Sequence, residues 1–248
     1  MKKAYFRFYE ELNDFFPAEK RKIKFEHTFI DRASVKDMIE SFGVPHIEID
    51  LILVNSKSVD FSYLVNDKDE ISVYPVFESL DISEVQHLRP KPLREPKFVL
   101  DVHLGKLTRY MRMMGFDTIY KNNYNDDGLI KISLDDKRTI LTRDREILKR
   151  NDVTHGHWVR NENPEEQLKE IIERFDLKDQ IKEFTRCLEC NDLLKKVEKE
   201  LVIEKLPPKV KEWYNEFFLC PQCNRIYWKG SHYERMHELI SRIKNNIS

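Results

Sequence analysis

The four cysteines of this chain, Cys187, Cys190, Cys220 and Cys223, form two Cys-x-x-Cys pairs. Each pair can place two thiolates on one tetrahedral ion, so two pairs complete a four-cysteine site that leaves no position for water. Two redox pairs or four separate buried thiols are the alternatives, and neither explains the paired spacing as economically as one zinc ion. The spacing therefore predicts a structural Zn²⁺ site within a ribbon over residues 184–236. It does not indicate what the protein does.

Composition predicts a soluble, charge-rich protein of two domains with room for a small third. Of the 248 residues, 35% are charged and 40% hydrophobic, and the mean hydropathy is −0.63. The apolar runs are too short to span a membrane, and the first residues lack the apolar core of a signal peptide. Together with reduced cysteine pairs, this predicts a cytoplasmic protein without a membrane partner.

Charge is spread unevenly along the chain, although the net charge is only −1. Residues 1–90 carry 12 Lys and Arg against 17 Asp and Glu, whereas residues 181–248 carry 13 against 10. The positive share lies in the later two thirds of the chain. Such an asymmetry permits a nucleic-acid partner, but solvated faces alone could also produce it.

The first 80 residues follow the strand order of a β-grasp domain. Alternating residues predict strands over 3–10 and 22–30, Ser34 begins a helix that stops at Gly43, and two apolar runs predict strands over 49–54 and 71–76. The segment LVNSKSVDFSYLVNDKDEISVYPV resembles the tail of ubiquitin-like sulfur carriers. Those carriers end in Gly-Gly, whereas this chain continues past the corresponding position. Residues 1–82 are therefore expected to dock onto another molecule or to shield one, rather than to transfer sulfur.

A strand–helix alternation follows a predicted linker over residues 83–96, where prolines and basic residues cluster. Short apolar strands are expected at 98–100, 118–120, 139–142 and 157–159. The helices between them include one over 104–114 and one that starts at Pro164. Repeated strand–helix units imply a parallel sheet. In the ribbon, hairpin strands are expected around 197–203 and 226–228, and a closing helix over 237–248.

Acidic side chains mark a candidate metal site at the ends of these strands. Asp101 and Asp144 end two of the strands, Asp126 stands at the entry to the helix between them, and Glu146 follows Asp144 by two residues. Ligands gather at the carboxyl ends of parallel strands, and Mg²⁺ or Mn²⁺ prefers oxygen ligands. Each acid alone has a simpler interpretation, since Asp126 and Asp144 are both suited to cap helices. A dehalogenase-type phosphatase is excluded because it needs Asp-x-Asp, and position 103 is His.

Basic residues recur every third position on the helix after Asp101, at Lys106, Arg109 and Arg112. With an apolar opposite face, this stripe is expected to face solvent or a phosphate backbone. A solvated face with salt bridges explains it equally well. Arg143, next to Asp144, is a further candidate for RNA contact.

Five blocks in order resemble the C-terminal RNase family named after the Mut-seven exonuclease: FVLDVHLGKLTRYMRMMGFDTIY, DDGLIKIS, RTILTRDREIL, RCLECNDLL and CPQCNRIYWKGSHYERM. Members have a PIN-like fold with a zinc ribbon, and several carry a ubiquitin-like domain in front. The resemblance implies metal-dependent RNA hydrolysis, with Asp101, Asp126 and Asp144 as ligands of Mg²⁺ or Mn²⁺. Glu146 stands where many PIN-like relatives have a further acid, and Asp127 is a neighbouring candidate.

The resulting hypothesis is a ribonuclease of α/β and α+β class. It comprises a ubiquitin-like β-grasp domain, a PIN-like parallel α/β (Rossmann-like) core over residues 97–183, and the four-cysteine zinc ribbon. RNA, with tRNA and rRNA as candidate classes, is the expected substrate, and the front domain is expected to bind a protein that the sequence does not identify. The rival hypothesis is a non-catalytic RNA-binding or adaptor protein that docks through that domain.

Overall fold

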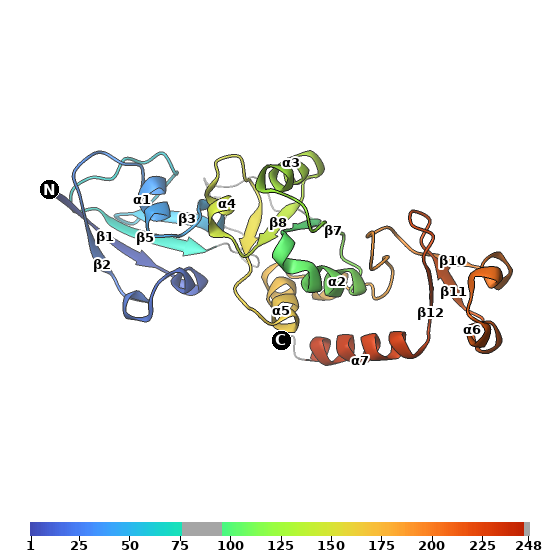
Figure 1. Cartoon of the computed structure of the whole chain (residues 1–248). Helices are drawn as coiled ribbons and strands as arrows, with labels where there is room; N and C mark the ends of the chain where they lie inside the picture. The colour runs from blue at the N-terminus through green and yellow to red at the C-terminus, as the bar shows by residue number, and fades with distance from the viewer. Residues whose placement is uncertain (76–95, 246–248) are drawn as a thin grey trace. The chain divides into compact units, whose positions relative to one another are not determined.

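The structure is a computed structural model that describes residues 1–75 and 96–245 (Figure 1). The chain divides into two compact units. The first holds residues 1–75 together with 133–136 and 142–158, and the second holds 96–132, 137–141 and 159–245. Apart from Pro96, the predicted linker lies outside the described residues.

A five-stranded sheet with the order β2-β1-β5-β3-β4 forms the first unit, as the β-grasp prediction requires. Strand β1 pairs in parallel with β5 and antiparallel with β2, and β3 pairs antiparallel with β5 and β4. The strands are β1 (Lys2–Phe8), β2 (Phe25–Phe29), β3 (Ile49–Val54), β4 (Lys57–Val59) and β5 (Glu70–Pro75). Strand β4 was not predicted because it is only three residues long and follows a tight turn at Asn55 and Ser56, both with positive φ.

Helix α1 (Val35–Ser41) packs on this sheet because its apolar side chains and those of the strands share one core. Ala4, Phe6 and Phe8 alternate along β1 and are buried against Met38 and Ile39 of the helix. As predicted, Ser34 caps α1, since its side chain accepts a hydrogen bond from the Asp37 N–H. Gly43 ends the helix with a φ of +90°, a conformation that glycine adopts without strain.

Strands β6 (Phe98–Leu100), β7 (Thr118–Tyr120) and β8 (Thr139–Thr142) pair in parallel, with β6 between the other two. All three residues of β6 are fully buried, which is typical of a parallel sheet covered on both faces. Helices α2 (Gly105–Met113) and α5 (Pro164–Arg174) bury their apolar faces in the same core. The predicted parallel α/β core is confirmed, and the remaining elements of this stretch are α3 (Asp126–Asp136), α4 (Arg145–Lys149) and β9 (Gly156–Trp158).

A three-stranded antiparallel sheet forms the ribbon, in the order β10 (Lys195–Val197), β11 (Phe217–Leu219) and β12 (Ile226–Trp228) (Figure 1). Strand β12 lies where it was predicted. The prediction of a strand over 197–203 was wrong, because that segment turns into short 3-10 helices that place Val202 and Leu206 against Phe217. Helix α6 (Pro208–Trp213) precedes β11, and the closing helix α7 (Ser231–Asn245) starts six residues earlier than expected.

Within residues 1–75 and 96–245, none of the helices combines the length and apolar character needed to cross a bilayer.

Candidate metal centre and nuclease site

Two equivalent turns carry the cysteines, each with the sequence Cys-x-x-Cys-Asn. In the first turn the Cys187 carbonyl accepts a hydrogen bond from the Asn191 N–H at 3.0 Å, and in the second the Cys220 carbonyl accepts one from the Asn224 N–H at 2.9 Å. Both asparagines have positive φ, 74° and 57°, which this residue tolerates. The two turns therefore present their thiols in the same way.

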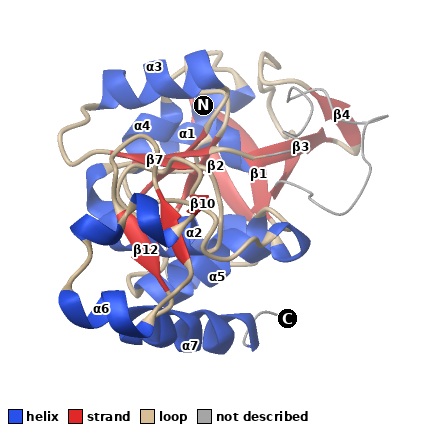
Figure 2. Cartoon of the chain, turned by 90° about the vertical axis from the view of Figure 1, so that its right-hand side faces the viewer, coloured by secondary structure: helices blue, strands red, loops and turns tan. Residues whose placement is uncertain are grey.

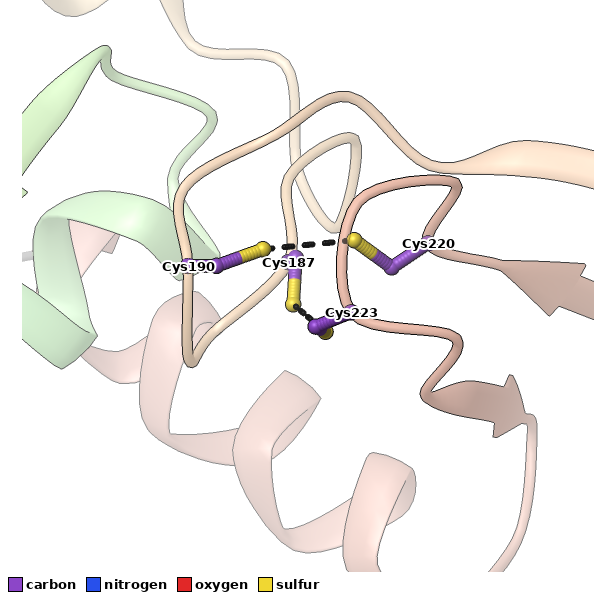
Figure 3. A group of neighbouring side chains, drawn as sticks. All are labelled: Cys187, Cys190, Cys220 and Cys223. Atoms are coloured by element: carbon purple, nitrogen blue, oxygen red, sulfur yellow. Dashed lines mark hydrogen bonds between the residues drawn. The ribbon is translucent and has the colours of Figure 1, made fainter.

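All four sulfur atoms lie within 4.8 Å of one another (Figure 3). The nearest pairs join the two turns, with 3.5 Å between the Cys187 and Cys223 sulfurs and 3.3 Å between those of Cys190 and Cys220. These separations exceed the ~2.05 Å of a disulfide. They approach the ~3.8 Å edge that four Zn–S bonds of about 2.3 Å give a tetrahedron. The geometry and the donor set thus fit a zinc ion with four thiolate ligands, which is the chemistry of a structural site.

Tyr227 of β12 supports the first turn. Its hydroxyl lies 3.1 Å from the Cys187 sulfur and accepts a hydrogen bond from the Leu188 N–H at 3.1 Å. Burial would raise the pKa of the Cys187 thiol, but hydrogen bonds from Tyr227 and from the backbone at Cys190 and Glu189 outweigh it and lower the pKa to about 7. These contacts favour the thiolate, the form that binds metal, at Cys187 alone. Burial and the neighbouring thiols raise the pKa values of Cys190 and Cys223.

Arg112 does not face solvent, which corrects the expectation for the basic stripe. Its side chain is 4% exposed, and the guanidinium donates to the carbonyl oxygens of Thr118, Leu188 and Glu189 at 3.0, 3.0 and 2.8 Å. A three-residue step falls about 60° short of a full helical turn, so a stripe with this spacing drifts around the helix. Lys106 and Arg109 are exposed, whereas Arg112 has turned inward toward the first cysteine turn.

Asn191 joins the first cysteine turn to the start of β7. Its side-chain oxygen accepts a hydrogen bond from the Thr118 N–H at 2.8 Å, and its amide nitrogen donates to Asp117 at 2.8 Å. Asp117 also accepts a hydrogen bond from Arg138 at 2.6 Å. Burial would raise the pKa of Asp117, but the hydrogen bonds from Arg138 and Asn191 prevail and hold it below its usual 3.8. The repeated Asn after each cysteine pair is the sequence feature from which this connection could have been suspected.

The strand-end acids occupy the positions expected from the sequence. Asp101 is 5% exposed and its side chain accepts a hydrogen bond from the His103 N–H at 2.6 Å. Asp144 is exposed and caps α4 by accepting one from the Glu146 N–H at 2.8 Å, as its simpler interpretation foresaw. Asp126 does not cap α3, since Asn125 does so through the Gly128 N–H, and the Asp126 side chain is exposed in the first turn.

Among residues 1–75 and 96–245, the four cysteines form the one group of three or more His, Cys, Asp or Glu side chains whose ligand atoms lie close enough to hold a metal ion. Asp101, Asp126 and Asp144 do not form such a group, and the Mg²⁺ or Mn²⁺ site assigned to them stays a prediction. Glu146 is exposed and pairs with Lys149 at 2.6 Å, and Arg143 is half-buried.

Comparison with protein families decides the family of the chain. Residues 96–240 match the model of the Mut7-C RNase domain. The chain belongs to the Mut7-C RNase domain family. Residues 1–81 match the Mut7-C ubiquitin model, so the β-grasp sheet is the ubiquitin-like domain of this family. No curated protein and no solved structure matches the chain.

Membership of the Mut7-C RNase domain family confirms the resemblance drawn from the five sequence blocks. It indicates a nuclease role and implies RNA as the substrate. The ubiquitin-like domain indicates an interaction with protein.

Proposed function

We propose that this Mut7-C protein is a metal-dependent ribonuclease in which Asp101, Asp126 and Asp144 bind Mg²⁺ or Mn²⁺. The observation that carries the proposal is the pairing of β6 with β8. These strands are parallel neighbours, with Leu100 opposite Leu141, and the Asp101 N–H donates to the Leu141 carbonyl at 3.1 Å. Asp101 follows the one strand directly and Asp144 lies three residues past Leu141. Both acids thus leave the carboxyl ends of adjacent parallel strands, where α/β sheets bind ligands.

The donor chemistry suits a hard divalent ion. Asp126 and Asp144 present exposed carboxylates, and Asp101 contributes a buried one. A divalent ion held there would supply Lewis-acid activation of water and would neutralise charge on the phosphodiester. Glu146 is the fourth acid of the proposal, at the exposed start of α4.

The basic residues of α2 are assigned to the RNA backbone. Lys106 and Arg109 are exposed on the helix that begins four residues after Asp101, so they could neutralise phosphates next to the cleaved bond. Arg143 precedes Asp144 and is a further candidate for this role. Arg112 has no part in the proposal because it is buried.

The test is cleavage of a mixed pool of short RNAs by the full chain, with Mn²⁺ or Mg²⁺ present or omitted. Asp101→Asn and Asp144→Asn keep side-chain size but remove the charge, so each should lower the cleavage rate by orders of magnitude in the presence of the ion. Asp135→Asn, at an exposed position near the end of α3, is the matched control and should cleave as the parent does. Parental rates in both strand-end variants would refute the assignment.

A non-catalytic adaptor is the second candidate, and the ubiquitin-like domain is the feature that favours it. An adaptor would bind RNA but would not cleave it with any divalent ion, and binding would survive loss of the acids. In either case the ubiquitin-like domain is the proposed docking module for a protein partner. The paired cysteines support a reducing, cytoplasmic compartment.

A further inference from the structure

A groove of about 760 Å³ lies in the second unit, between α2, the ribbon and α7. Helices α6 and α7, both labelled in Figure 2, each contribute residues to its lining. Its cationic lining residues come from three helices and one turn: Arg109 of α2, Lys209 of α6, Arg235 of α7 and, in the turn before β12, Arg225. None of the described residues that line it is acidic. In a chain with a net charge of −1, this is a strong local excess of positive charge.

These cations are not used to hold the fold together. All four side chains belong to exposed residues. Within residues 1–75 and 96–245, Arg109, Lys209 and Arg235 form no salt bridge with an acidic side chain. Arg225 has a loose pair with Glu189 at 3.4 Å, and both side chains are about half exposed (55% and 46%). Such exposed pairs contribute little to stability, so the groove keeps its charge available for an anion.

Aromatic rings stand among the cations. Trp213, at the end of α6, is 71% exposed, which is unusual for so large an apolar side chain. Trp228 and Tyr214 line the same groove, and both also pack against the core around Phe217. A Cβ atom at Gly230 would lie 2.8 Å from the Trp228 indole nitrogen and 3.5 Å from the Tyr214 hydroxyl. The glycine therefore allows the backbone to approach these rings closely.

We infer that this groove binds single-stranded RNA, with phosphates on Arg109, Lys209, Arg225 and Arg235 and bases stacked on Trp213 and Trp228. A groove with cationic and no acidic lining residues attracts a polyanion such as the phosphate backbone of RNA. Unpaired bases of any sequence can stack on its exposed aromatic rings. The bases of a duplex are already stacked and are not available to Trp213. The inference rests on the proposed ribonuclease function for the choice of nucleic acid.

Arg109 links the groove to the proposed cleavage site. It lies eight residues after Asp101, roughly two helical turns along the same segment, and it lines the groove. A strand held by the ribbon and α7 would thus pass along α2 toward the strand ends. The ribbon then serves as an RNA-holding surface in addition to its structural role.

The experiment measures binding of a fluorescein-labelled 12-nucleotide oligouridylate by anisotropy, with the zinc-loaded full chain and without Mg²⁺ or Mn²⁺. RNA integrity is checked on a gel after each titration. Trp213→Ala should weaken binding by roughly 5-fold to 150-fold, the effect of removing one stacked base, while Trp213→Phe retains most of the affinity. Lys209→Ala with Arg235→Ala should lower the slope of log affinity against log salt by about 1.4, at about 0.7 per contact.

Matched controls lie on the ribbon outside the groove. Leu201→Ala removes a 75% exposed apolar side chain, and Lys195→Ala with Lys205→Ala removes two exposed cations. Both should bind as the parent does. The proposed RNA-binding role of the groove would be wrong if these controls lost as much RNA affinity as the groove variants. It would also be wrong if the Trp213 and Lys209/Arg235 variants bound RNA as tightly as the parent. Tighter binding of a 12-base-pair RNA duplex than of the single strand would also contradict the proposal. So would polyglutamate, an anionic polypeptide, if it displaced the RNA and its own binding depended on Trp213.

The two proposals fail in distinguishable ways. Trp213-dependent binding without cleavage in any divalent ion would refute the ribonuclease proposal and leave the groove intact. If cleavage depends on Asp144 but Trp213→Ala changes neither the KM nor the RNA affinity, the RNA-binding role of the groove is refuted and the ribonuclease proposal stands.

Discussion

The Arg112 guanidinium donates a hydrogen bond to the Leu188 carbonyl oxygen at 3.0 Å, so a helix of the nuclease core holds the backbone of the first cysteine turn. The same nitrogen donates to Glu189, and the Nε atom donates to Thr118. The forked, planar guanidinium can serve all three carbonyls at once, which a lysine ammonium in the same place cannot. Arg112 therefore ties the first cysteine turn to the parallel sheet, alongside the connection made by Asn191.

Replacement of Arg112 should affect stability rather than RNA contact. Arg112→Lys keeps the charge but leaves buried carbonyls without a partner, so the free energy of unfolding should fall by roughly 1–3 kcal/mol. Arg109→Lys, an exposed change on the same helix, should alter it by less than about 0.5 kcal/mol. Urea denaturation of both variants checks this. Equal stability of the two would mean that the Arg112 contacts do not support the fold.

Zinc should be present at one ion per chain and should be required for the ribbon. Cys220→Ser removes one of four thiolates, so metal content measured by mass spectrometry should fall well below one per chain. Amide exchange over residues 184–230 should then quicken, because structural zinc contributes directly to folding. Gln222→Ser, an exposed change inside the same turn, serves as the control and should retain zinc. A zinc-free preparation with parental amide protection would contradict the assignment.

Asp117 should make the second unit sensitive to acid. Its pKa is lowered in the folded protein, so the carboxylate stabilises the fold fully above its unfolded pKa of about 3.9 and loses that effect as pH falls through the folded value. Asp117→Asn should therefore be less stable than the parent at pH 7 and pH 5, and the difference should shrink at pH 3. Urea denaturation at the three pH values measures it, with exposed Asp179→Asn as control. A difference that does not change with pH would show that the charge of Asp117 is not responsible.

Local sequence rules succeeded where a pattern is short and self-contained. The Cys-x-x-Cys spacing predicted a group of four thiols, and the alternation around Phe6 and Phe8 predicted a strand of the β-grasp sheet. Buried β6 was found from its continuous apolar run, and Asp101 and Asp144 were placed at strand ends correctly. In each case the neighbours along the chain determine the structure.

The misplaced features depend on contacts between distant residues. Arg112 was assigned to a solvent-facing stripe because residues three apart were treated as lying on one face of the helix. Each such step rotates the side chain by about 60° around the helix axis, which brings Arg112 to the buried side. The 197–203 segment has apolar residues suited to a strand. The chain instead turns there, and Val202 and Leu206 pack against Phe217 in one apolar cluster. The groove could not be predicted because Arg109, Lys209 and Arg235 are far apart in sequence and meet only in the folded chain.

The ubiquitin-like domain should unfold together with residues 142–158, because the two share a buried contact within the first unit. Glu48 is fully buried and its carboxylate accepts a hydrogen bond from the Trp158 N–H at 2.8 Å. The His157 ring nitrogen lies 3.4 Å from the same oxygen, with both side chains 1% exposed. The Trp158 ring packs on Phe15 at 4.7 Å between centroids. The isolated segment 97–248 would lose these contacts, so experiments on the nuclease require the full chain.

Glu48→Ala should lower the free energy of unfolding by roughly 3–5 kcal/mol, the cost of removing one member of a buried polar pair. Glu48→Gln should cost less, because its amide oxygen can still accept from the Trp158 N–H. Exposed Glu19→Gln is the control. In hydrogen exchange, Glu48→Ala should weaken protection of β1, β5 and residues 142–158 together, as expected of one cooperative unit. Loss of protection confined to residues 142–158, with the sheet of the ubiquitin-like domain unchanged, would show that the contact does not couple them.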